Sequence, residues 1–147
     1  MAQHNELGNL GEEYAQAYLR SNGYHIRHTN WHNTTPSGAE GKLELDIVAE
    51  KDGMLIVVEV KTRSTETFEH PKEAITKKKI KNIINATHEY IFQFDWQGET
   101  RFDVISAMPH GQSFKIEHIE DAFLAPSFLW IMFFGAIRCN LKIEKVF

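Results

Sequence analysis

The chain has 147 residues, and its 42% hydrophobic and 24% charged residues are typical of one folded domain with a substantial core. Sixteen basic against twenty acidic residues give a net charge of −4, which excludes a generally basic nucleic-acid-binding domain, so that such a partner would need a local patch. The lone cysteine, Cys139, excludes an internal disulfide, and residues 1–6 show no basic segment leading into an apolar one, so we expect no secretory signal and a cytoplasmic location.

The first part of the chain predicts a helix, a strand and a loop. Apolar residues recur at helical spacing over residues 5–21, and Asn22-Gly23 is a typical helix end. Residues 24–31 follow as a predicted strand. Residues 33–41 contain Pro36 and two glycines, which indicates a loop.

Two further strands and a second helix are predicted next. The apolar runs at residues 43–50 and 54–62 are joined by Lys51-Asp52-Gly53, which is typical of a hairpin between antiparallel neighbours. Pro71 fits the first position of a helix, where its missing N–H is harmless. An apolar stripe from Ala74 to Ile91 continues that helix.

Two strands complete the predicted order. Residues 100–107 and 114–119 carry strand patterns, and Pro109-His110-Gly111 between them indicates a turn. The resulting order, α-β-β-β-α-β-β, predicts an α/β fold with a mixed central β-sheet flanked by helices.

Charged residues end two of these apolar runs. Glu59 and Lys61 lie two apart at the end of one strand, so their side chains share a face, with Cα atoms about 6.6 Å apart. Asp46 lies in the preceding strand, and the hairpin would bring its carboxylate close to both. Two carboxylates and an ammonium together are the chemistry of a divalent-metal site for phosphodiester cleavage, whereas an isolated Glu-x-Lys pair is usually a solvated surface pair.

Several segments together resemble one known family. The chain resembles the YraN-like family of uncharacterised bacterial proteins at Gly11-Glu12, residues 44–49, residues 58–63 and Lys79, and in three further segments. That family is similar to the PD-(D/E)xK nuclease superfamily, which implies a restriction-endonuclease-like core. The family pattern tends to have Gly where this chain has Leu43. The further matching segments are Pro71 with Glu73-Ala74, residues 101–105 and residues 119–123.

The resemblance implies metal-assisted hydrolysis. Asp46, Glu59 and the backbone carbonyl of Val60 would hold Mg²⁺ or Mn²⁺ through hard oxygen ligands. Lys61 would orient the attacking water or offset developing charge. Glu12 is carried over as a further metal ligand or water contact, and with Asp46, Glu59 and Lys61 it completes the predicted catalytic set.

The function that these expectations indicate is a metal-dependent endonuclease acting on DNA, including branched or repair intermediates. The alternative is a non-catalytic nucleic-acid-binding or protein-interaction module on the same fold. A third alternative is a hydrolase of RNA or a small molecule that uses the same site. Resolvase-like action would need a homodimer that presents two sites.

A lysine run is the best local basic patch. Its members, with Arg63, could neutralise backbone phosphates, although such a run is also what the solvated face of a helix looks like. Lys79 is the preferred contact because it matches the family's lysine. The predicted nucleic-acid-binding residues are Arg63, Lys77, Lys78, Lys79 and Lys81.

Other polar residues are secondary candidates. Glu44 shares the strand face of Asp46, and we expect it to be a charge at the edge near the loop before a metal ligand. Arg101 and Asp103 share a face as well, and we expect a structural ion pair first and substrate contact second. His25, His28 and His32 lack zinc-site spacing.

The chain divides at about residue 125. Residues 1–125 form the predicted nuclease domain, and residues 126–147 form an apolar C-terminal tail. The apolar stretch from Phe128 is shorter than the roughly 17 to 25 residues of a membrane span. We therefore expect the tail to pack on the core or on a partner such as a second copy, and we expect no membrane association.

Overall fold

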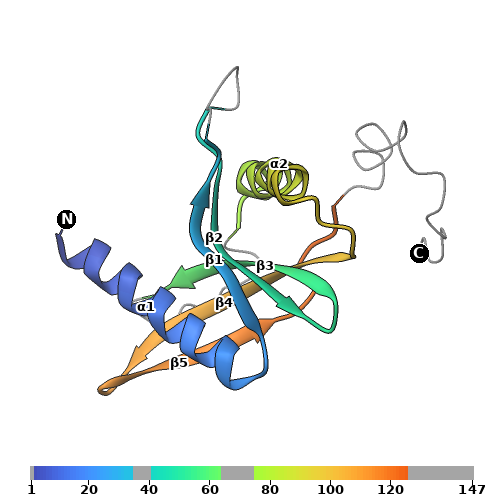
Figure 1. The fold of residues 1–147 in the computed structure, drawn as a ribbon. Helices are drawn as coiled ribbons and strands as arrows, with labels where there is room; N and C mark the ends of the chain where they lie inside the picture. The colour runs from blue at the N-terminus through green and yellow to red at the C-terminus, as the bar shows by residue number, and fades with distance from the viewer. Residues whose placement is uncertain (1, 35–40, 64–74, 126–147) are drawn as a thin grey trace.

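The computed structural model describes residues 2–34, 41–63 and 75–125. These residues form two helices and five strands in the predicted order, so the expected α/β class is confirmed (Figure 1). Among them, no helix is long and apolar enough to cross a membrane. The elements are α1 (Ala2–Ser21), β1 (His25–His32), β2 (Glu44–Lys51), β3 (Met54–Thr62), α2 (Lys77–Phe94), β4 (Thr100–His110) and β5 (Ser113–Ile119).

The strands form one mixed sheet in the order β1-β2-β3-β4-β5. Three neighbouring pairs are antiparallel, and β3 and β4 are parallel. A parallel pair needs a long crossover, and α2 lies within the connection between β3 and β4.

The two helices cover opposite faces of the sheet. On β3, Leu55 and Val57 belong to the core under α2, whereas Ile56 and Val58 belong to the core under α1. This alternation follows from the period of two in a strand, and burial on both faces explains why β3 is apolar almost throughout. The helices contribute Ile83, Ile84, Ala86, Tyr90 and Ile91 from α2, and Ala15 and Leu19 from α1.

The predicted hairpin between β2 and β3 is confirmed. Lys51 lies opposite Met54, and the two residues between them have positive φ, 52° at Asp52 and 75° at Gly53. Positive φ at both central residues defines a type I′ turn, whose twist matches that of the flanking strands. This turn sets the register that brings the start of β2 beside the end of β3.

The second helix begins later than Pro71, so that prediction was wrong. Thr76 is extended (φ −69°, ψ 154°), and its side chain accepts a hydrogen bond from the Lys79 N–H, which makes it the N-cap of α2. Ile75 is buried with Val104 and Ala122 instead of continuing the helix. Pro71 itself lies outside the described residues, as does the tail from residue 126.

The turn between β4 and β5 also lies elsewhere than predicted. Pro109 and His110 continue β4 and pair with Phe114 and Ser113, and Gly111 follows with a positive φ of 63°. The pairing of β4 with β3 ends at Ala107. Pro109 therefore lies beyond the central part of the sheet, where a residue without an N–H is tolerated.

Candidate functional site

The site begins where the pairing of β2 with β3 stops. The last pair is Ile47 with Val58, and Asp46 and Glu59 come directly after it. The Val60 N–H donates a hydrogen bond to Asp46 Oδ2 at 2.9 Å. A side-chain carboxylate thus takes the place of a ladder acceptor, and this bond fixes Asp46 next to the end of β3.

Glu59 is a buried carboxylate between two ammonium groups. Its side chain is 4% exposed, and its Oε1 lies 3.5 Å from Lys61 Nζ and 3.3 Å from Lys79 Nζ. The pKa of Glu59 is raised to about 7, because burial and, after it, the charge of Asp46 outweigh the opposing effect of the two lysines. Asp46, Glu59 and Lys61 are therefore brought together as the sequence predicted.

Lys79 belongs to the same centre. The sequence predicted it only as a phosphate contact and missed its contact with Glu59. Its Nζ pairs with Glu59 across the gap between α2 and β3, and its side chain is about one-third exposed. Burial alone would lower the pKa of Lys79, but the charges of Glu59 and Asp46 outweigh it and raise that pKa. The missed signal was helical spacing, because Lys79 lies in line with the buried Ile83, Ala86 and Tyr90.

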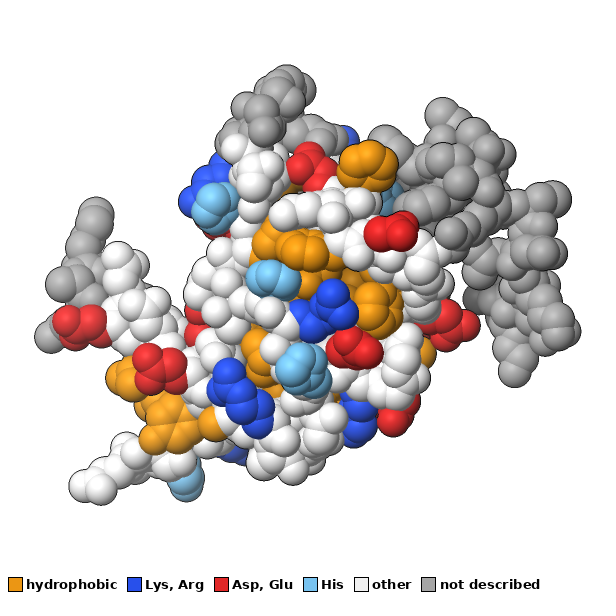
Figure 2. All heavy atoms as spheres, in the orientation of Figure 1, with side chains coloured by type: hydrophobic (Ala, Val, Ile, Leu, Met, Phe, Trp, Pro, Cys, Tyr) orange, Lys and Arg blue, Asp and Glu red, His pale blue; other side chains and the backbone are white. Residues whose placement is uncertain are grey.

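The other predicted phosphate contacts lie on α2 and just after β3. Lys77, Lys78 and Lys81 are exposed on the first turns of α2. Arg63 directly follows β3, and its backbone N–H donates to the Ala107 carbonyl. On the face shown in Figure 2, acidic and basic side chains are interspersed, and no broad basic surface appears.

Glu12 lies on α1, on the opposite side of the sheet from α2, close enough for its charge to interact with that of Asp46. Gly11 allows this, because a Cβ at residue 11 would lie 2.0 Å from Thr62 Oγ1 at the end of β3. Burial raises the pKa of Glu12, the charge of Asp46 raises it further, and a hydrogen bond with the Asn30 side chain lowers it. Glu12 is thus electrostatically coupled to Asp46, while its role as a ligand stays a prediction.

The donor set fits a hard divalent ion that keeps part of its water shell. In the described parts of the chain, no three side chains of His, Cys, Asp or Glu are grouped as a metal cage. Asp46 and Glu59 offer two carboxylates, and the carbonyl of Val60 is a third oxygen at the same strand end. Mg²⁺ is typically held by one or two carboxylates with waters and substrate phosphates. A cation here would offset both the burial of Glu59 and its repulsion with Asp46, which together raise the pKa of Glu59.

The protein comparisons identify the family. The sequence profile described as "Uncharacterised protein family UPF0102" matches residues 11–107. The chain belongs to this family. UPF0102 proteins similar to it include one from Phocaeicola vulgatus, 50% identical over 126 residues (86% of this chain, 98% of the relative). Others are from Bacteroides thetaiotaomicron, 45% identical over 87% of this chain and all of the relative, and from Flavobacterium psychrophilum, 42% identical over 84% and 98%.

The UPF0102 match confirms the YraN-like resemblance and spans the site. Its range of residues 11–107 begins at Gly11, which lets α1 approach β3, and includes Glu12, Asp46, Glu59 and Lys79. The names of these relatives state no activity.

Arg101 and Asp103 form the expected ion pair, away from this site. Arg101 donates two hydrogen bonds to Asp103, at 2.8 and 2.7 Å, and His118 and the Asp121 N–H also contact the same carboxylate. Burial alone would raise the pKa of Asp103, but these contacts lower it. Asp103 pairs with Val58, which faces α1, whereas Glu59 lies on the other face.

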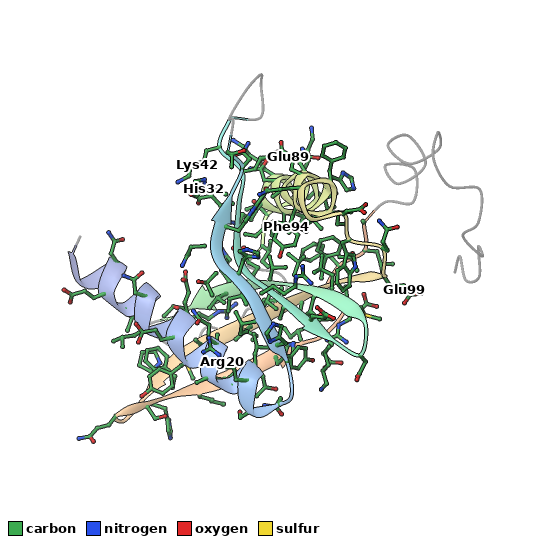
Figure 3. All side chains as sticks on the ribbon, in the orientation of Figure 1. Arg20, His32, Lys42, Glu89, Phe94 and Glu99 are labelled. Atoms are coloured by element: carbon green, nitrogen blue, oxygen red, sulfur yellow. The ribbon has the colours of Figure 1, made fainter. Side chains whose placement is uncertain are left out.

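The remaining secondary candidates have local partners. Glu44 forms an ion pair with Lys42, and hydrogen bonding to Lys42 lowers the pKa of Glu44. His28 Nδ1 lies 2.6 Å from the hydroxyl of the buried Tyr90. His32 and Lys42 lie near one another at the Glu44 end of β1 and β2 (Figure 3).

Proposed function

We propose that this protein is a metal-dependent endonuclease that hydrolyses phosphodiester bonds in DNA, with branched and repair intermediates as the first substrates to test. The observation that carries the proposal is the convergence of Asp46 and Glu59 where the β2–β3 pairing ends, with Lys61 and Lys79 within 3.5 Å of Glu59. Buried carboxylates with perturbed pKa values next to ammonium groups are characteristic of catalytic sites.

Each side chain has a role in this chemistry. Asp46, Glu59 and the Val60 carbonyl would hold Mg²⁺ or Mn²⁺, which supplies a more acidic water and polarises the phosphoryl oxygen. Lys61, on β3, would orient the attacking water and offset charge developing on the phosphoryl group. Glu12, whose charge interacts with that of Asp46, would serve as a further metal ligand or hold a water by hydrogen bonding.

The composition of the first turn of α2 supports the proposal that the substrate is a polyanion. Lys77, Lys78 and Lys79 all lie there, and the turn contains no acidic residue. Cations at a helix N-terminus oppose the helix dipole and cost stability, whereas an anion there is favoured. Three lysines in the first turn go against the usual preference for acidic residues there, and such departures are expected where function requires them. DNA phosphates would supply the missing negative charge, with Lys81 and Arg63 as further contacts.

Cleavage assays with conservative variants test this proposal. Wild type, Asp46→Asn, Glu59→Gln and Lys61→Met are incubated with Mg²⁺ or Mn²⁺ and labelled four-way, flapped, single-stranded and duplex DNA. Asp46→Asn keeps an acceptor for the Val60 N–H, whereas Asp46→Ala would leave that donor unsatisfied at about 1–3 kcal/mol. We expect each variant to lose cleavage by more than about a hundredfold, the loss that removing even an outer-shell partner can reach.

The control is Glu13→Gln, which changes an exposed carboxylate on α1 next to Glu12 and should leave cleavage unchanged. A folded wild type that binds DNA but cleaves none of these substrates with either metal would contradict the endonuclease proposal. A non-catalytic nucleic-acid-binding or protein-interaction module would then be the better description. Cleavage that is equal in wild type and variants would instead indicate a contaminating nuclease.

A further inference from the structure

Lys79 differs from the neighbouring lysines in where its charge lies. Lys77, Lys78 and Lys81 are exposed, whereas Lys79 is half-buried with its Nζ 3.3 Å from Glu59 Oε1. The Thr76 side chain accepts a hydrogen bond from the backbone N–H of Lys79 at 3.2 Å. This bond caps the helix, which begins at Lys77, and holds Lys79 in its first turn. One member of the basic run is therefore directed into the carboxylate centre by the fold itself.

We propose that Lys79 is a built-in counter-cation that occupies the carboxylate centre when no divalent ion is bound and transfers to a DNA phosphate when the ion enters. The inference rests on the proposed function, because it concerns the same centre. It assigns Lys79 a positioning role: it couples metal binding to phosphate binding. Metal and nucleic acid should then bind cooperatively, each strengthening the other by the same factor.

The charges around Glu59 favour this exchange. Two ammonium groups already lie within 3.5 Å of one carboxylate oxygen. A divalent ion on the same carboxylate would stand a few ångströms from both, and like charges at such distances repel strongly in a poorly solvated site. One ammonium must therefore move away, or the ion binds weakly.

Lys79 is the ammonium that can move. Lys61 is attached two residues from Glu59 on the same strand, so its side chain stays on the face of β3 that carries Glu59. Lys79 comes from a different element, so its flexible four-carbon stem can swing away from β3, and both lysine side chains are about one-third exposed. Lys77 and Lys78 precede it on the first helical turn, where a phosphate would meet helix N–H groups as well.

Mn²⁺ affinity of the full chain tests the exchange. Calorimetric titration without nucleic acid compares wild type, Lys79→Met, Lys79→Arg and the matched control Lys78→Met, with Asp46→Asn as the site reference. We expect Lys79→Met to bind Mn²⁺ about tenfold more tightly, because a competing charge is removed from a poorly solvated site. Lys79→Arg should stay near wild type, and Lys78→Met should change affinity less than about twofold because its charge is screened.

A second measurement tests the coupling. Binding of a phosphorothioate DNA duplex is followed by fluorescence anisotropy with and without Mn²⁺. We expect Mn²⁺ to strengthen binding to the wild type and to Lys78→Met, and to have little effect on Lys79→Met. A variant that is merely misfolded could not gain metal affinity, so the first result also excludes a purely structural role for Lys79.

The outcomes separate this inference from the proposed function. If wild type binds Mn²⁺ through Asp46 but Lys79→Met binds no more tightly than Lys78→Met, the counter-cation role is overturned and the metal site stands. If no variant binds Mn²⁺ with or without DNA, both proposals fail. If only Lys79→Met binds Mn²⁺ without DNA, the exchange is supported in its strongest form.

Discussion

At the scale of the residue, Glu59 is the least expected side chain in the sheet. It follows five apolar residues on β3, and its side chain is 4% exposed. Burying a carboxylate is costly even with partners, and the pKa of Glu59 is raised to about 7 despite the two lysines. A fold under selection for stability alone would place an apolar residue here, so Glu59 is best explained by the chemistry of the site.

The raised pKa predicts how stability depends on pH. Between the unfolded value of 4.5 and about 7, the folded protein binds more protons at Glu59 than the unfolded chain does. Its contribution to stability therefore falls as pH rises through this range. Relative to Glu59→Gln, the wild type should lose about 3 kcal/mol of unfolding free energy between pH 4.5 and pH 8.5. Urea denaturation of both proteins at several pH values, without metal, measures this difference.

The control for the pH series is Glu13→Gln, because Glu13 is an exposed carboxylate on α1. Its unfolding free energy should follow that of the wild type across the range. A difference between wild type and Glu59→Gln that is constant with pH would show that Glu59 has an ordinary carboxylate pKa in the folded state.

At the scale of the element, the approach of α1 to β3 depends on Gly11. A Cβ at this position would lie 2.0 Å from Thr62 Oγ1 and 3.1 Å from Thr62 Cβ and Cγ2. Gly11→Ala must therefore displace either Thr62 or the helix, and overpacking of this kind typically costs about 1–3 kcal/mol. We expect a loss of stability in that range by chemical denaturation, and a loss of cleavage because Glu12 moves with the helix.

Two further variants make the Gly11 prediction specific. Gly8 lies on the same helix, and a Cβ added there would meet no other part of the described structure within 4 Å, so Gly8→Ala should be neutral or stabilising by about 0.5 kcal/mol. Adding Thr62→Ala to Gly11→Ala should recover part of the lost stability, because the closest atom is removed. Equal effects of Gly8→Ala and Gly11→Ala would contradict close helix–strand packing.

The elements also show which parts of the molecule could be predicted from sequence. The β2–β3 hairpin and the convergence of Asp46, Glu59 and Lys61 followed from local patterns, the period of two and the Asp52-Gly53 turn. The start of α2 was placed too early because Pro71 is a good first helical residue, whereas Ile75 is recruited by a core that only the tertiary structure defines. Lys79 was predicted as a phosphate contact and not as part of the carboxylate centre, because a run of lysines conceals which one lies above the buried stripe.

At the scale of the whole molecule, function must be reconciled with a net charge of −4. An acidic protein cannot attract DNA through its overall field, so binding must come from a few lysines near the centre. The fold concentrates them by placing the first turn of α2 beside the end of β3. The mixed topology makes this arrangement possible, since α2 begins within the crossover from β3 to its parallel neighbour β4.

The salt dependence of DNA binding tests this local patch. For duplex DNA, the logarithm of the binding constant falls with the logarithm of the salt concentration by about 0.9 per phosphate contact. Lys77→Gln/Lys78→Gln should therefore reduce the slope by about 1.8 and weaken binding about equally across DNA sequences. The control is Arg20→Gln, since Arg20 is exposed near the end of α1, at the other end of the molecule from His32 and Lys42 (Figure 3). Fluorescence anisotropy over a series of KCl concentrations gives both slopes. Equal slopes for the wild type and the double variant would show that DNA is held elsewhere. Removing the charge of a lysine that contacts a phosphate must change the number of counterions released on binding, and therefore the slope.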